Sequence, residues 1–126
     1  ILHQKKNYPT EYNQISAADY SSTGWQNRTE QQAWKLGFVT PYAGMEPQED
    51  FVEVIANYLV KPDGFWENML ANAGTEGATK IQTKFDMVKE WLMTAWNIDI
   101  DELRTIIIRR SGDIDSILNE KIAYNE

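Results

Sequence analysis

Apolar residues in the second half of the chain recur at intervals of three and four positions, the spacing that places side chains on one face of an α-helix. One such series consists of Ile81, Phe85, Val88, Leu92 and Ala95. It predicts the longest helix of the chain, from about Ala78 to Trp96. Trp66, Trp91 and Trp96 stand at helical spacing with other apolar residues, which predicts that they belong to the core.

A last helical segment is expected from about Asp101. Its inward-facing residues are expected to be Leu103, Ile106 and Ile107. Ser111 and Gly112 predict a kink or break in this helix. The apolar spacing resumes after them, with Ile114, Ile117, Leu118 and Ile122.

Three shorter helices are expected at about 29–36, 47–60 and 65–74. Thr29 is a suitable N-cap for the first of them, and Gly37 would end it. Pro47 stands in the first turn of the second, where proline is favoured. Gly74 is expected to end the third.

These patterns predict an all-α chain with one helical domain over residues 1–126. Residues 1–46 are expected to be mostly irregular with a short helix, and residues 47–126 to be helices. With 42% hydrophobic and 12% aromatic residues, the chain has enough large apolar side chains to fold.

The formal net charge of −7 argues against a nucleic-acid partner, because phosphates attract basic surfaces. The chain has no cysteine, which excludes disulfides and thiolate metal sites. No apolar run approaches the roughly 18 residues of a membrane span.

The helix expected from Pro47 carries a narrow polar strip on an otherwise apolar surface. At about 100° per residue, Glu49, Asp50, Glu53 and Asn57 share one sector. Acidic residues in a first turn are favoured by the helix dipole, and the strip could simply face water. However, Glu49 and Glu53 are a like-charge pair one turn apart, which is unfavourable on a bare helix. A metal ion, or a metal-bound histidine, would make this pair favourable, so both interpretations stay open.

The run from Glu49 to Glu53 resembles the E-x-F-x-E stretch of lethal-factor-type zinc proteases, which are gluzincin metallopeptidases. In those enzymes a downstream helix supplies a glutamate as third zinc ligand, and an acid one turn later orients a ligand histidine. A tyrosine seven residues before the glutamate ligand faces the substrate carbonyl, and Tyr42 stands seven before Glu49. The resemblance implies that Glu49 binds zinc, that Glu53 supports the site, and that Tyr42 is a catalytic donor to the oxyanion.

The start of the chain, Ile1-Leu2-His3-Gln4, resembles the residues just after HExxH in a family of zinc-binding metallopeptidase lipoproteins of glycan-importing Gram-negative bacteria. Residues 8–12 and 25–42 are similar to that family as well. Only one histidine, His3, is present, so HExxH does not lie within the chain. The resemblance therefore implies the C-terminal part of a larger zincin-type metallopeptidase. His3 is either an additional ligand or a surface residue close to the site.

The resemblance also implies that zinc binds in the full-length protein and is absent from this part alone. We expect zinc-dependent hydrolysis of a peptide or protein substrate in the full-length protein. Possible partners are import-complex proteins. The implied location is exported, periplasmic or on the outer-membrane surface, with a lipid anchor outside this chain. The alternative is a non-catalytic helical binding module, in which exposed aromatic rings would stack on sugars.

Tyr42 is expected on an irregular segment bent by Pro41 and Gly44, immediately before the Glu49 helix. In the catalytic interpretation its hydroxyl lies in a surface concavity on the same face as Glu49, near Ile1. In the alternative interpretation the ring packs inward as part of the core.

Overall fold

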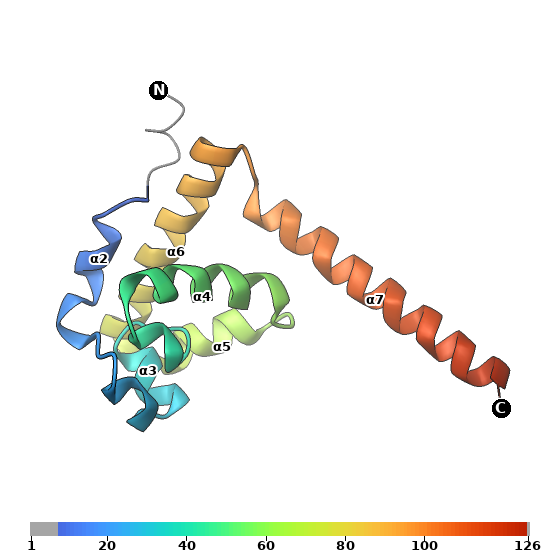
Figure 1. Ribbon diagram of the computed structural model, residues 1–126, viewed down its shortest axis with the longest axis horizontal. Coiled ribbons are helices and arrows are strands. Elements are labelled where there is room, and N and C mark those ends of the chain that lie inside the picture. The colour runs from blue at the N-terminus through green and yellow to red at the C-terminus, as the bar shows by residue number, and fades with distance from the viewer. Residues whose placement is uncertain (1–7, 126) are drawn as a thin grey trace.

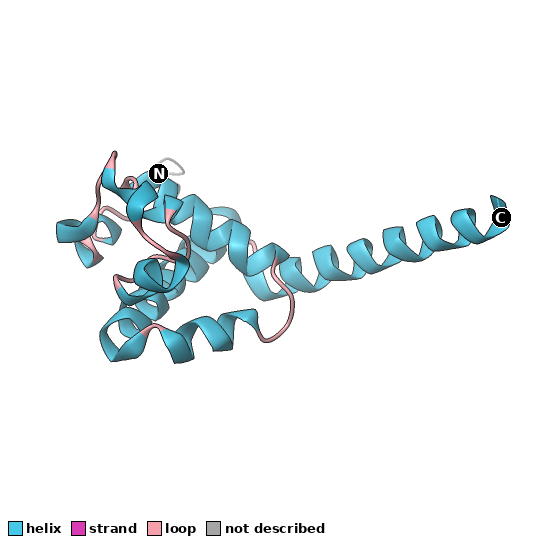
Figure 2. Ribbon diagram, turned by 90° about the horizontal axis from the view of Figure 1, so that it is seen from below, coloured by secondary structure: helices cyan, strands magenta, loops and turns pink. Residues whose placement is uncertain are grey.

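The computed structural model describes residues 8–125, and every regular element in this range is helical (Figures 1 and 2). The α-helices are α2 (Tyr12–Ile15), α3 (Glu30–Lys35), α4 (Pro47–Val60), α5 (Phe65–Asn72), α6 (Gly74–Trp96) and α7 (Ile100–Asn125). The 3₁₀ turns are η1 (Ala17–Asp19), η2 (Gly24–Asn27) and η3 (Tyr42–Gly44). The all-α class predicted from the sequence is confirmed. The short helix α2 was not predicted.

The local signals at the helix ends act as the sequence indicates. Thr29 accepts a hydrogen bond from the backbone N–H of Gln32, and the Gln32 side chain accepts one from the N–H of Thr29, which completes a capping box at α3. Gly37, with a φ of 92°, follows the end of this helix. Pro47 occupies the first turn of α4.

The predicted boundaries of the last helices were partly wrong. Gly74 opens α6 instead of ending α5, because its φ of 76° turns the chain between the two helices. The longest helix is α7, with 26 residues against 23 in α6. It continues through Ser111 and Gly112 without a break, and Gly112 has no neighbour that a side chain would strike.

The C-terminal half of α7 extends away from the other helices (Figure 1). Leu103, Ile106 and Ile107 are half-buried, whereas Ile114, Ile117 and Leu118 are more than half exposed. Trp96 is 47% exposed, so its assignment to the core was wrong. It lies at the last turn of α6, beyond the buried position Leu92. Trp66 and Trp91 are partly buried against the core, as expected.

The core lies between α4, α6 and the helices that pack on them, α3, α5 and the first turns of α7. Its fully buried apolar side chains include Tyr12, Phe38, Val39, Val54, Met69, Ile81, Val88 and Ile100. At one point α3 and α6 approach so closely that only glycine fits. A Cβ atom on Gly77 would stand 2.4 Å from the carbonyl oxygen of Trp34.

The core also contains an ion pair without solvent contact. Lys84 Nζ of α6 lies 2.8 Å from Asp50 Oδ2 of α4, and both side chains are fully buried. Tyr12 and Tyr20 donate their hydroxyl hydrogen bonds to the same carboxylate, at 3.1 and 2.6 Å. Lys84 also donates to Ser16 Oγ, at 2.9 Å. It donates as well to a backbone carbonyl oxygen, that of residue 37, at 2.7 Å. Burial, followed by the charge of Asp50, raises the pKa of both tyrosines, so they remain protonated donors.

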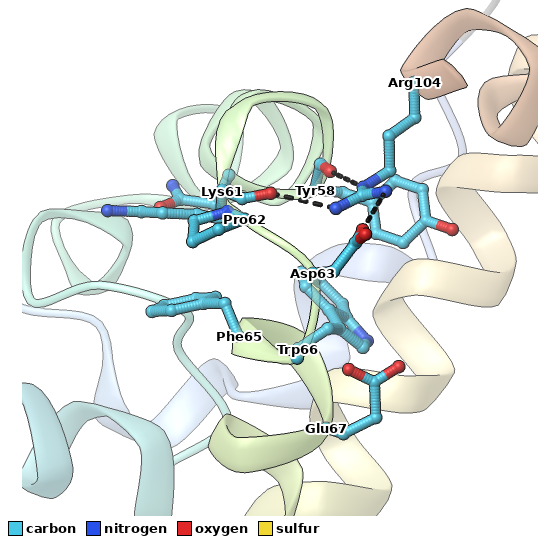
Figure 3. Close-up of a pocket in the computed structure, with 10 residues that line it drawn as sticks. Tyr58, Lys61, Pro62, Asp63, Phe65, Trp66, Glu67 and Arg104 are labelled. Atoms are coloured by element: carbon cyan, nitrogen blue, oxygen red, sulfur yellow. Dashed lines mark hydrogen bonds and ion pairs between the residues drawn. The ribbon is translucent and has the colours of Figure 1, made fainter. Parts of the chain in front are cut away.

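Arg104 fastens α7 to the segment between α4 and α5 (Figure 3). Its Nε and Nη2 atoms donate to the carbonyl oxygens of Tyr58 and Lys61, both at 2.9 Å, and Nη1 lies 3.0 Å from Asp63 Oδ1. These contacts form one wall of a small pocket, which Phe65 also lines. The guanidinium therefore has a structural role in this pocket, since all three of its nitrogens have protein partners.

Replacing Lys84 by Met should destabilise the fold by about 3–5 kcal/mol, because Asp50 would be left buried without its counterion. The matched control is Lys89→Met, which removes an exposed pair with Asp101 and should cost at most about 1 kcal/mol. Chemical denaturation of both variants measures the difference. Equal losses would show that the buried pair contributes no more than the surface pair.

Gly77→Ala should lower the free energy of unfolding by about 1–3 kcal/mol or more, because the new methyl group meets the backbone of α3. Gly112→Ala is the same change on an exposed part of α7 and should be neutral or stabilising by up to about 1 kcal/mol. Thermal unfolding followed by circular dichroism compares the two. A Gly77→Ala variant as stable as the parent would contradict the close approach of α3 and α6.

Candidate functional site

Glu49 and Glu53 lie one turn apart near the start of α4, and both are half-buried. Pro47 begins this helix, and the preceding Glu46 is in an extended conformation. The two carboxylates therefore project from the same side of a helix whose start is defined by proline. This side-by-side placement is the one that the spacing predicts.

Asp50 and Asn57 do not share this half-exposed position, so the predicted polar strip is divided. Asp50 is fully buried in the ion pair with Lys84, and Asn57 is 6% exposed, with its amide donating to the carbonyl oxygen of Glu53 at 2.8 Å. One residue is about 100° around a helix, so Asp50 can face α6 while Glu49 stays at the rim. The interpretation of a strip that simply faces water was therefore wrong for these two residues.

Tyr42 begins the 3₁₀ turn η3, just before α4, and is 37% exposed. Its ring stands edge-on to Trp25, with centroids 5.1 Å apart. The pKa of Tyr42 is raised by partial desolvation and then by the charge and hydrogen bonding of Glu49, with smaller contributions from Glu46 and Glu53. The structure thus brings Tyr42 and Glu49 together, with the phenol at the surface.

Glu53 is joined to the loop that carries the tyrosine. Its Oε1 accepts a hydrogen bond from the hydroxyl of Thr40, at 2.9 Å. Thr40 Oγ1 in turn accepts from the backbone N–H of Ala43, at 3.1 Å. The sequence analysis did not identify Thr40. A signal was available, because a threonine at the start of a turn that contains Pro and Gly commonly accepts a hydrogen bond from the backbone N–H three residues later.

Two of these side chains are carboxylates, a group that can bind zinc. Zinc in catalytic sites takes three protein ligands and a water molecule, and a carboxylate oxygen is a suitable ligand. Within residues 8–125 no group of three or more His, Cys, Asp or Glu side chains is arranged to hold a metal ion. Glu49 is the ligand that the sequence resemblance implies. His3 and Ile1, whose proximity to Glu49 was predicted, lie outside the described residues.

Comparisons with known proteins identify the family of this chain. Residues 1–101 match the model of a family described as "Putative zinc-binding metallo-peptidase". A crystal structure of a protein of the same description from Bacteroides caccae ATCC 43185 is 49% identical and superposes with a TM-score of 0.84. The match covers 91% of this chain and 44% of that one, so this chain spans less than half of its relative's length. A search of curated proteins gave no match. The family match and the 49% identity show that this chain belongs to the family of zinc-binding metallo-peptidases so described.

Proposed function

We propose that this chain is the C-terminal part of a zinc-dependent peptide hydrolase, in which Glu49 is a zinc ligand and Tyr42 stabilises the oxyanion. The observation that carries the proposal is the position of the Tyr42 phenol at the surface beside Glu49, at the start of α4. Family membership supports the zinc and peptidase parts of the proposal. The fold supports it further, because Pro47 and the buried Asp50 hold Glu49 in a defined direction.

The proposed roles follow from the chemistry of the groups. Zinc, when bound, supplies a water of lowered pKa and polarises the scissile carbonyl. Tyr42 is protonated at neutral pH, since the pKa of a tyrosine is ordinarily about 10 and partial desolvation and the nearby carboxylates raise the pKa of Tyr42 further. A protonated phenol beside the metal ligand can donate a hydrogen bond to an oxygen that gains negative charge. Glu53, one turn after Glu49, would hold the metal-binding side chains in their orientation.

The remaining ligands and the general base belong, in this proposal, to an HExxH segment outside this chain. The longer chain of the Bacteroides caccae relative supports this, since less than half of it matches. The substrate would be a peptide or a protein, and import-complex proteins are possible partners. An exported, periplasmic or outer-membrane surface location with a lipid anchor rests on the sequence resemblance. No helix in the described part of the chain is long and apolar enough to cross a membrane.

The aromatic residues give less support to a sugar-stacking module. Trp66 packs against Tyr58 and Phe85, and Trp91 packs edge-on against Phe51, with ring centroids 5.3 Å apart in each of these contacts. Aromatic rings that are packed in the core are not exposed for stacking on sugars. We therefore propose the hydrolase as the function of the longer protein.

Tyr42→Phe in the full-length protein should lower kcat by about 10²-fold, the typical loss for one oxyanion donor, and leave the zinc content unchanged. Steady-state kinetics on a peptide substrate, with metal analysis of the same sample, measures both. Tyr58→Phe is the matched control, because it removes a tyrosine hydroxyl that contacts Asp101 and has no role in the proposed site. Unchanged turnover in Tyr42→Phe would show that Tyr42 has no catalytic role and serves only to pack against Trp25.

The 126-residue chain alone should show no submicromolar zinc site in calorimetric titration, because its described residues supply too few ligands. In the full-length protein, Glu53→Gln should weaken zinc binding by about 10–100-fold. Glu49→Gln should weaken it further. Glu67→Gln, an exposed carboxylate on α5, serves as the control and should leave affinity unchanged. A tight one-to-one site in the 126-residue chain would place the ligands elsewhere.

A further inference from the structure

One side chain, Thr40, links the turn that carries Tyr42 to α4 by hydrogen bonds. The Thr40 hydroxyl donates to Glu53 Oε1 at 2.9 Å and accepts from the N–H of Ala43 at 3.1 Å. One oxygen atom thus joins α4 to the backbone of η3. Because the carboxylate accepts the hydroxyl proton, the lone pairs of Thr40 are directed to the turn.

The far end of the same turn is fixed from the opposite side. The carbonyl oxygen of Gly44 accepts a hydrogen bond from the N–H of Ser21 at 2.9 Å. A Cβ atom on Gly44 would lie 2.6 Å from Arg28 Nη1 and 3.2 Å from the Phe38 ring, so the backbone is pressed against both. Arg28 itself is held by the carbonyl oxygen of Asp19, at 2.6 Å.

Tyr42 therefore lies between Gly44, whose backbone is anchored, and Thr40, whose hydroxyl joins the start of the turn to α4. Gly44 is held at one side, and the buried Val39 accepts from Trp34 Nε1 at the other, so movement of the turn would be confined to the residues between them, which include Thr40. The Tyr42 ring packs edge-on against Trp25 and the residue is 37% exposed, so core packing alone does not hold it. Loss of the Thr40 contacts would free the phenol to move relative to Glu49.

We propose that Thr40 is a positioning residue that couples α4, which carries the metal ligand Glu49, to the Tyr42 turn. Glu53 then has a second task besides support of the metal site, since it holds Thr40 and through it the tyrosine. The inference deepens the proposed function and rests on the role of Tyr42 stated there. The competing explanation is that Thr40 is an ordinary turn cap, which contributes stability alone.

Thr40→Val keeps the shape of the side chain and removes the hydroxyl, whereas Thr40→Ser keeps the hydroxyl. In the 126-residue chain, NMR should show a shifted Ala43 amide and loss of the Trp25–Tyr42 ring contact in Thr40→Val, and neither change in Thr40→Ser. Glu53→Leu removes the same hydrogen bond from the other side and should reproduce the effect if Thr40→Val folds poorly. Ring contacts and amide shifts that match the parent in Thr40→Val and Glu53→Leu would overturn the proposal.

In the full-length protein, Thr40→Val should lower kcat by about 10–100-fold, the cost of a displaced catalytic group, with KM and zinc content within about twofold of the parent. Thr40→Ser should restore most of the rate. A lowered Tm with unchanged kcat would make Thr40 a turn cap and overturn the proposal. If Tyr42→Phe itself has no effect on turnover, the proposed function fails. The NMR comparison then still decides whether Thr40 positions the ring.

Discussion

The buried ion pair between Asp50 and Lys84 is the constraint on which the arrangement of the other elements depends. Two opposite charges removed from water are costly, and the cost is offset only when the remaining hydrogen-bonding positions are filled. Here they are filled from two other parts of the chain. Asp50 accepts from Tyr12 and Tyr20, and Lys84 donates to Ser16 and to a backbone carbonyl after α3. The N-terminal segment, the α3 turn, α4 and α6 therefore converge on one point.

This convergence determines which side of α4 faces outward. Apolar residues occupy most of its circumference, and two of them, Val52 and Val60, are 57% and 66% exposed. Burial of apolar area alone therefore distinguishes poorly between rotations of this helix. A rotation by one residue would bring Asp50 out of reach of Lys84. The charge pair selects the observed rotation, and Glu49 and Glu53 consequently lie at the half-exposed rim.

Much of the fold could be predicted from the sequence because its signals are local. The cap at Thr29, the proline that opens α4 and the apolar face of α6 depend on residues within a few positions of one another. Lys84 could not be assigned in this way, although it lies three residues after Ile81 and four before Val88, on the buried face. A lysine is normally exposed unless it is paired, and its partner Asp50 is remote in sequence. The exposed end of α7 and the exposure of Trp96 depend likewise on what packs nearby, which spacing does not specify.

The same division applies to the candidate site. Two features could be predicted from spacing, namely that Glu49 and Glu53 project side by side and that Tyr42 stands on a bend before them. The hydrogen bond that links them could not be predicted. Thr40 and Glu53 are 13 residues apart in the sequence, and they meet only because of the turn formed by Pro41 and η3. The two levels are nevertheless connected physically. The Asp50–Lys84 pair determines the rotation of α4. That rotation places Glu53 within hydrogen-bond distance of Thr40, whose hydroxyl donates to it. The position of the surface phenol thus depends, through α4, on a charge pair that never meets solvent.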